Sequence, residues 1–446
     1  MIRKRDISPV EVVKSQLARI RKLDPTLNAY ALVMEESALA QAQAAEAKIM
    51  RGDYCGPLHG IPIAVKDLFA TQGVQTQGGL KLLSGHVPDH DAVVVARLKQ
   101  AGAILLGKLH TAEGAMDGYH PDFPIPRNPW SADRWPGVSS SGSGVAVAAG
   151  VCYAALGTDT GGSVRIPAAA NGIVGLKPTY GLVSTEGVLP LAASFDCVGS
   201  MARSVGDAAI LLHGMTPPSD ESAMEIRGLR IGFDERLCTE GVQPCQTEAV
   251  QQALRVLRKR GAQVVPASLP TLDEVSGIWY TIAASEAAMA HQDTFPSQRS
   301  EYGEGFRAFL EQGRGISPTE YREAQRRRAE WSERTGECFS DFDVLACPSL
   351  PGEAFLYNPA AAYRGPDLAG GHSDGIPLAY LAAMNRLMLP FNLNGYPALS
   401  LPCGMSRQGV PLSLQFIGRP FSESLLIKCG IAFENQTQWH LQRPLV

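Results

Sequence analysis

Short apolar strands alternate with helices between residues 61 and 157, and glycine-rich turns join them. Strands are expected at 61–66, 103–107 and 152–157, with helices at 91–101 and 143–149. Such an alternation is typical of α/β proteins, in which helices cover a central sheet. We therefore predict the α/β class, with a mixed, largely parallel twisted sheet covered by helices on both faces.

The alternation continues more loosely through the rest of the chain. A capping box at Ser8–Glu11 opens an N-terminal helix, and an alanine-rich helix is expected over about 36–50. Further strands are expected at 229–233, 263–265, 343–347, 397–401 and 412–417, and further helices at 246–260, 280–293, 318–337 and 421–433. The stretch 351–376, rich in Gly, Pro and Ala, is expected to be a loop. Because the 446 residues contain no internal repeat or low-complexity linker, we expect one large domain, 1–446.

The charge balance and the cysteines restrict the partners and the compartment. Lys and Arg number 40 against 44 Asp and Glu, so no basic surface for nucleic acid or an anionic membrane is expected. No apolar run approaches the roughly 20 residues of a spanning helix, and the N-terminus lacks the apolar segment of a secretory signal. Nine cysteines without a C-x-x-C pair argue against disulfides and structural zinc. We predict a cytoplasmic protein.

Motifs of several other enzyme classes are incomplete. Residues 102–108 have the spacing of a phosphate-binding loop, but Leu109 stands where Ser or Thr would hold magnesium. The nine His lack paired ligand spacing, so neither a metal nor another cofactor is predicted. The segment 137–142 has Ser in place of the second glycine of a G-x-S-x-G elbow, which argues against an α/β-hydrolase Ser-His-Asp triad.

Two segments rich in glycine and serine remain as candidates for chemistry. The first, 136–144, precedes an Ala/Val helix, and taken alone it is best explained as a helix N-cap. The second, 157–167, follows an apolar strand and contains Gly161-Gly162-Ser163. Consecutive glycines let several backbone N–H groups point at one spot, as an oxyanion requires. Ser163 is therefore a candidate nucleophile.

A nucleophilic serine needs a proton acceptor, and Lys66 at the end of a buried strand is a candidate. To act as a base it must be neutral, so its pKa must fall by about 3 units from about 10.4. Burial among apolar strands can supply that decrease. The alternative is that Lys66 pairs with the neighbouring Asp67 at the sheet edge.

Six successive segments of the chain resemble the amidase signature family. They are His59–Asp67, Arg127–Trp130, Gly137–Gly150, Gly157–Pro167, Gly175–Gly181 and Pro411–Gly418. The resemblance implies a signature core at about 57–215 and a C-terminal half that completes the sheet and the substrate pocket. It also implies hydrolysis of an amide through an acyl-serine intermediate.

The resemblance further implies a Ser-cis-Ser-Lys triad. Ser163 would be the nucleophile, Ser139 the bridging serine on a cis peptide, and Lys66 the base. The backbone N–H groups of Thr160, Gly161, Gly162 and Ser163 would form the oxyanion hole, and supporting roles would fall to Ser140, Thr158, Asp159 and Arg165. Because Val138 stands where the family commonly has glycine, Ser140 remains the alternative to Ser139.

The substrate pocket is expected to involve Asn385 and the segment 119–124. Glutaminase-type relatives usually have an acidic residue at the place of Asn385, so its neutral side chain predicts a preference for acyl groups without an α-ammonium. Tyr119, His120 and Phe123 are expected in an apolar wall of the pocket, with a surface loop as the equal alternative.

We therefore expect a stand-alone cytoplasmic amidase that releases ammonia or an amine from a small carboxamide. Its expected partner is a small-molecule amide rather than nucleic acid or a membrane, and a homodimer is left open. One alternative is a glutaminase-type A subunit of a glutamyl-tRNA amidotransferase. The other is a non-catalytic binding or scaffold protein on the same fold.

Overall fold

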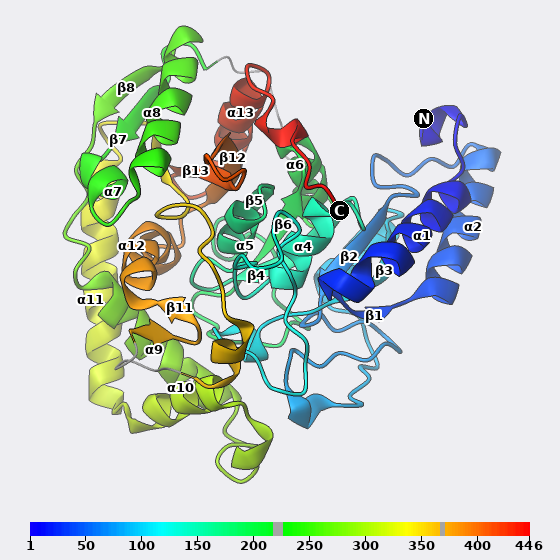
Figure 1. The fold of residues 1–446 in the computed structure, drawn as a ribbon, viewed down its shortest axis with the longest axis horizontal. Coiled ribbons are helices and arrows are strands. Elements are labelled where there is room, and N and C mark those ends of the chain that lie inside the picture. The colour runs from blue at the N-terminus through cyan, green and yellow to red at the C-terminus, as the bar shows by residue number, and fades with distance from the viewer. Residues whose placement is uncertain (217–225, 366–370) are drawn as a thin grey trace.

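An open twisted sheet runs through the middle of the molecule (Figure 1). The computed structural model describes residues 1–216, 226–365 and 371–446, and within these residues the sheet has eleven strands. In the order in which they lie side by side, they are β1 (Tyr30–Val33), β3 (Ile104–Leu109), β2 (Pro62–Lys66), β4 (Ala154–Asp159), β6 (Cys197–Ala202), β5 (Val174–Lys177), β12 (Ala398–Met405), β13 (Pro411–Gly418), β9 (Val344–Pro348), β7 (Arg230–Phe233) and β8 (Gln263–Pro266). A separate two-stranded sheet pairs β10 (His372–Ser373) with β11 (Ile376–Pro377).

The sheet is mixed, and its parallel pairings lie in two groups of three strands. β3, β2 and β4 are parallel, as are β9, β7 and β8. The strands between these groups, from β4 through β6, β5, β12 and β13 to β9, pair antiparallel. The α/β class and the mixed sheet are thus confirmed, whereas the parallel pairing inferred from the strand–helix alternation applies only to the two groups. The reason is that β12 and β13 form a hairpin, which needs no crossover helix.

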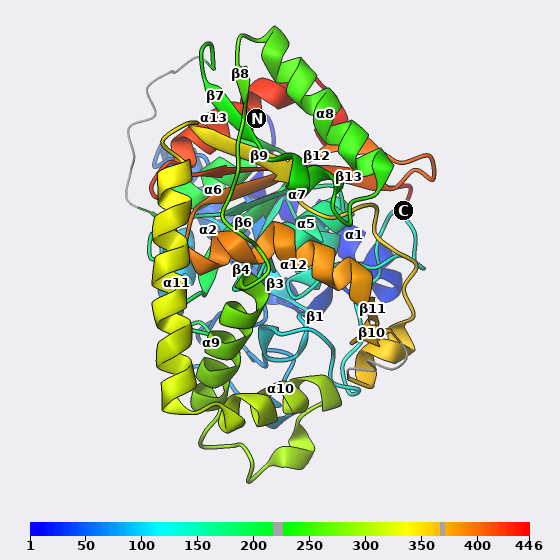
Figure 2. The same ribbon diagram turned by 90° about the vertical axis from the view of Figure 1, so that its left-hand side faces the viewer.

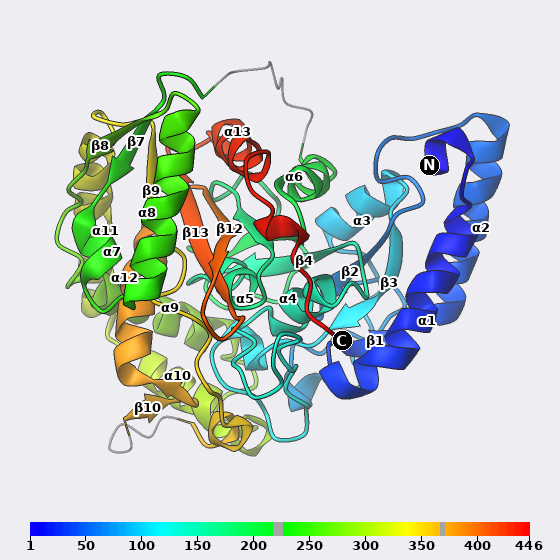
Figure 3. The same cartoon turned by 45° about the horizontal axis from the view of Figure 1, so that its top comes forward.

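Helices of varied length cover this sheet (Figures 1 and 2). They are α1 (Pro9–Leu27), α2 (Glu35–Arg51), α3 (Val93–Gln100), α4 (Ser141–Ala148), α5 (Arg165–Ala170), α6 (Val205–His213), α7 (Glu235–Thr239), α8 (Pro244–Lys259), α9 (Val275–Ala290), α10 (Glu304–Gly315), α11 (Pro318–Cys338), α12 (Leu378–Leu393) and α13 (Glu423–Glu434). Figure 3 shows α1 and α2 at one end of the molecule and α7, α8 and α11 at the other. None of the helices in the described ranges is both long enough and apolar enough to cross a lipid bilayer.

The predicted helices and strands are found close to their expected positions, and some elements were not foreseen. The capping box of α1 is present, with Glu11 accepting from the Ser8 N–H. The sequence analysis missed β1, β5, β6, β11, α5, α6, α7, α10 and α12. In α12 the signal is broken by Pro390, which lies inside the helix although proline usually marks a helix boundary. The expected loop at 351–376 contains β10 and a short 3-10 helix at Pro359–Tyr363, and its residues 366–370 lie outside the described ranges.

Candidate active site

The site is built on the carboxyl ends of two neighbouring parallel strands. Lys66 is the last residue of β2, and Thr158 is next to last in β4, with which β2 pairs. The Lys66 ammonium nitrogen Nζ lies 2.8 Å from Thr158 Oγ1 and 2.8 Å from Ser139 Oγ. All three side chains are buried. The sheet therefore brings the candidate base to the candidate bridging serine.

Burial lowers the pKa of Lys66 from 10.5 to about 7, although the negative charges of Asp196 and Asp159 oppose the decrease. A substantial fraction of Lys66 is therefore neutral at neutral pH, as a proton acceptor must be. The alternative that Lys66 pairs with Asp67 is wrong. The Asp67 carboxylate instead faces the buried Lys108, with 3.2 Å between Oδ1 and Nζ.

Two adjacent serines at the start of α4 have different partners. The peptide bond between Val138 and Ser139 is cis, and Ser139 Oγ accepts from Lys66. The Ser140 hydroxyl is instead held by the β4 backbone, donating to the Thr158 carbonyl at 3.2 Å and accepting from its N–H at 3.3 Å. The Ser140 N–H donates to the Ser163 carbonyl at 3.3 Å. The serine-rich segment therefore lies directly against the turn that contains Ser163.

The turn after β4 exposes backbone N–H groups beside Ser163. Gly162 has a φ of 119°, a conformation that favours glycine, and a Cβ there would lie 2.7 Å from Ile166 Cδ1. Its N–H donates to Asp159 Oδ1 at 2.8 Å. Within the described residues, the N–H groups of Thr160, Gly161 and Ser163 form no hydrogen bond. Three of the four expected oxyanion donors are thus free, and that of Gly162 is occupied.

A buried ion pair holds this turn in place. Arg165 Nε and Nη2 each donate to the Asp159 carboxylate at 3.0 Å, and both side chains are inaccessible to solvent. Burial would raise the pKa of Asp159, but the charges of Arg165 and Lys177 hold it well below its usual range. Arg165 also donates to Asn392 Oδ1 at 2.6 Å and to Gln415 Oε1 at 3.2 Å. Asn392 and Gln415 belong to α12 and β13, and nothing in the local sequence singles them out.

Thr160 is fixed from two further sides. Its hydroxyl donates to Asp196 Oδ1 at 2.5 Å, and its carbonyl accepts from Trp279 Nε1 at 2.9 Å. Burial raises the pKa of Asp196 to about 6, although its hydrogen bonds and the charge of Lys66 oppose the increase. The sequence analysis missed Asp196 and Trp279, because each is an isolated residue outside the recognised motifs.

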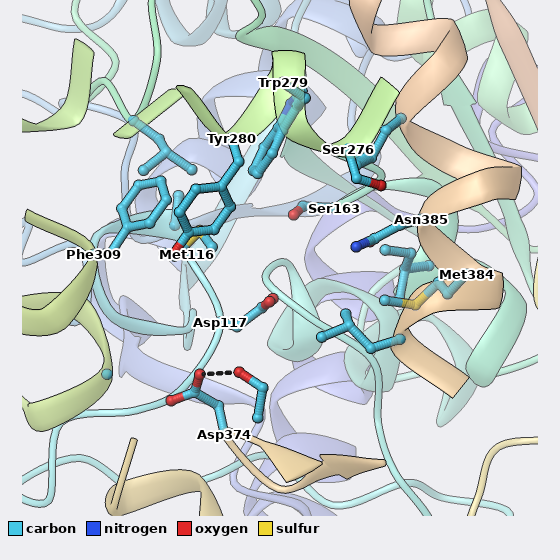
Figure 4. A pocket seen from close by; sticks show the side chains of 18 of the residues that line it. Met116, Asp117, Ser163, Ser276, Trp279, Tyr280, Phe309, Asp374, Met384 and Asn385 are labelled. Carbon is cyan, nitrogen blue, oxygen red and sulfur yellow. Dashed lines mark hydrogen bonds between the residues drawn. The ribbon is translucent and has the colours of Figure 1, made fainter. Parts of the chain in front are cut away.

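Ser163 opens into a cavity formed by α9, α10, α12 and the segment after β3 (Figure 4). The walls are mainly apolar and aromatic, formed by Met116, Ile166, Trp279, Tyr280, Phe309, Met384 and Leu389. The polar side chains are those of Asp117, Ser163, Ser276, Gln312, Ser373, Asp374 and Asn385. Asn385 therefore lies in the cavity, where it was expected.

The three residues expected in the apolar wall do not line this cavity. Tyr119 is buried, and its hydroxyl donates to Ser141 Oγ at 2.7 Å. His120 Nδ1 accepts from the Asp122 N–H at 3.1 Å, and the rings of His120 and Phe123 contact each other edge to face. The expectation was wrong because Tyr119 packs towards α4, while Met116 and Asp117 face the cavity instead.

Comparison with known proteins shows similarity over the whole chain. The family described as Amidase matches residues 11–427. The "Putative amidase AmiD" of Mycobacterium tuberculosis is 41% identical, covering 100% of this chain and 94% of that protein. The A subunit of the glutamyl-tRNA(Gln) amidotransferase of a Roseiflexus species is 40% identical, covering 98% and 95%. The crystal structure of a peptide amidase from Stenotrophomonas maltophilia superposes with a TM-score of 0.83 at 29% identity, covering 99% and 96%. By sequence and by fold, this chain belongs to the amidase signature family.

Proposed function

We propose that the protein hydrolyses a small carboxamide through an acyl-enzyme formed on Ser163. The observation that carries the proposal is the buried contact between Lys66 Nζ and Ser139 Oγ beside the turn that presents Ser163. In the first step, Ser163 Oγ attacks the amide carbonyl carbon while its proton passes to Ser139, whose own proton passes to neutral Lys66. The relay then reverses, the C–N bond breaks, and the leaving nitrogen takes the proton.

Water completes the reaction by repeating the attack on the ester. It loses a proton through the same relay, and the carboxylate leaves Ser163. The Ser163 hydroxyl forms no hydrogen bond among the described residues, so the relay requires its Oγ to turn towards Ser139 when substrate binds. Such contacts commonly tighten only in the complex with substrate.

The oxyanion that develops on the carbonyl needs hydrogen-bond donors. The N–H groups of Gly161 and Ser163, with that of Thr160 beside them, are available for this role, whereas Asp159 occupies the N–H of Gly162. We assign Gly162 and the Asp159–Arg165 pair to holding the turn. Removal of one such donor typically slows acyl transfer by about 10²-fold or more.

The test combines covalent labelling with an amide panel. A fluorophosphonate should modify Ser163, as peptide mass mapping would locate, and the purified chain should release ammonia from simple aliphatic amides. A modified serine elsewhere would remove Ser163 from the role. The presence of all three triad side chains disfavours a non-catalytic scaffold.

The second candidate is the glutaminase-type A subunit, which the similarity to the Roseiflexus protein favours. In that case the chain would hydrolyse glutamine best and would depend on partner subunits linked to tRNA. Comparing glutamine with neutral amides on the isolated chain distinguishes the two. A cytoplasmic location is part of the proposal, and cell fractionation would test it. A homodimer is left open, and light scattering would decide it.

A further inference from the structure

The cavity that contains Ser163 is acidic at one end. Asp117 follows the 3-10 turn at Glu113–Ala115, and Asp374 lies between β10 and β11. Figure 4 shows the Asp117 carboxylate directed into the cavity, between the Ser163 hydroxyl and Asp374 in that view. Among the described residues that line the cavity there is no Lys, Arg or His. The Asp117 carboxylate therefore faces the cavity without a cation among the described residues of its wall.

Asp117 is half-buried, and it differs from the buried carboxylates near the site. Asp159 is neutralised by Arg165, and Asp67 faces Lys108. Within the described ranges, Asp117 forms neither a hydrogen bond nor an ion pair. Burial, together with the charge of Asp374, raises its pKa to about 7. A bound cation would favour its ionised form, because an opposite charge nearby stabilises a carboxylate.

A hydrogen bond and close packing fix the position of the Asp374 carboxylate. Its carboxylate accepts from Ser373 Oγ at 3.1 Å. It packs against Gly118 and Gly305, and a Cβ on Gly118 would lie 2.7 Å from Asp374 Oδ1. These glycines leave the room that the carboxylate occupies at the cavity wall.

Two aromatic rings flank the acidic end. Tyr280 and Phe309 line the cavity and contact each other edge to face, with ring centroids 5.1 Å apart. Burial, with the charges of Asp117 and Asp374, raises the pKa of Tyr280 to about 12, so its hydroxyl lies within their field. An alkylammonium group is attracted both by an aromatic face and by a carboxylate, so a site that combines the two favours such a group.

We propose that this end of the cavity is a subsite for a positively charged amine on the substrate, with Asp117 as the residue that selects it. The inference rests on the proposed function, since Ser163 at the other end supplies the reaction. The substrate class is then a short aliphatic amide whose chain ends in an ammonium group. This class is compatible with the preference for acyl groups without an α-ammonium that Asn385 predicts, because the terminal ammonium would contact a different wall of the cavity.

The experiment compares two amides of nearly equal size on the purified full-length chain at neutral pH and low salt. They are pentanamide and 5-aminopentanamide, which differ at the end of the chain. We expect kcat/KM to favour the charged amide by at least about tenfold, and Asp117→Asn to bring that ratio close to one. The matched control is Asp122→Asn, which neutralises an exposed carboxylate paired with Lys81 outside the cavity and should leave the ratio unchanged.

A second measurement does not depend on a folded variant. Butylammonium should inhibit the hydrolysis of pentanamide by the wild-type protein more strongly than butanol does. The inference is overturned if pentanamide is hydrolysed at least as well as its charged analogue, if Asp117→Asn keeps the preference, or if both inhibitors act equally. If neither amide is hydrolysed and Ser163 is not labelled, the proposed function itself fails.

Discussion

Lys66 Nζ and Ser139 Oγ lie 2.8 Å apart in the interior, although 73 positions separate the two residues in the chain. The contact exists because Lys66 ends β2, while α4 begins just after Ser139 and packs on the neighbouring β4. A lysine in such surroundings acts as a base only if burial keeps part of it neutral.

Ser163→Ala should reduce kcat/KM for amides by about 10³-fold or more, because the covalent route is lost while one hydroxyl is removed. Fluorophosphonate labelling should disappear as well. Ser297→Ala, which changes an exposed serine, is the matched control and should keep both. Retention of more than about a tenth of the activity by Ser163→Ala would exclude Ser163 as nucleophile.

Lys66→Arg should be nearly as damaging as Lys66→Ala. A guanidinium cannot lose its proton in the working pH range, so it cannot accept the proton of Ser139. Initial rates on pentanamide with circular dichroism of each folded variant provide the check. If Arg restored activity, Lys66 would be a structural cation and not a base.

The pH profile should report the neutral form of Lys66. Since burial lowers the pKa of Lys66 to about 7, the neutral base predominates above that pH and is lost below it. We expect kcat/KM for pentanamide to rise by about tenfold per pH unit below pH 7 and then to level off. A rise that continues towards pH 10 would mean that Lys66 titrates like an exposed lysine.

Substitution of Ser139 should mainly reduce activity, whereas substitution of Ser140 should mainly reduce stability. Ser139→Ala removes the hydroxyl that contacts Lys66 and should slow hydrolysis by about 10²-fold or more. Ser140→Ala removes hydrogen bonds to the Thr158 backbone, so it should cost about 1–3 kcal/mol of stability while most of the activity remains. Parallel rate measurements and denaturant unfolding distinguish the two effects, and the reverse pattern would identify Ser140 as the bridging residue.

Arg165→Met should destabilise the protein by about 3–5 kcal/mol, because it leaves the carboxylate of Asp159 buried without its cation. The control is Arg326→Gln on α11, whose exposed ion pairs are screened by solvent and should contribute little to stability. Urea unfolding of both variants measures the difference. Equal midpoints would show that Asp159 does not depend on Arg165.

The sequence predicts the parts of the site that form locally and misses those that depend on distant packing. Lys66 and Ser163 stand at strand ends next to recognisable turns, so their candidacy can be read from neighbouring residues. Asn392 and Asp196 reach the site only through contacts between remote segments, and no local pattern marks them. Tyr119 is the opposite case, a residue that was predicted to line the cavity and does not. An aromatic residue in a loop gives the same sequence signal whether it lines a cavity or is buried in the protein interior.

The same distinction between local and distant determinants applies to the strands of the sheet. Regular strand–helix alternation correctly predicts β2, β3 and β4, because their apolar runs are bounded by turns. β5 and β6 escape prediction, since Lys177 and Ser200 interrupt their apolar character although both are buried. The antiparallel centre of the sheet follows from these strands and from the β12–β13 hairpin, so it could not be foreseen without them.

The hydrogen bonds of Arg165 depend on residues that are synthesised much later than Arg165 itself. Its partners Met388, Asn392 and Gln415 follow it by 223, 227 and 250 positions. During translation, the strands that bring Lys66 to Ser139 leave the ribosome long before these partners are synthesised. A nascent or truncated chain that ends before β13 therefore contains Ser163 but lacks one of the hydrogen bonds that fix the turn around it. We expect full hydrolytic activity only after the last part of the polypeptide has been synthesised.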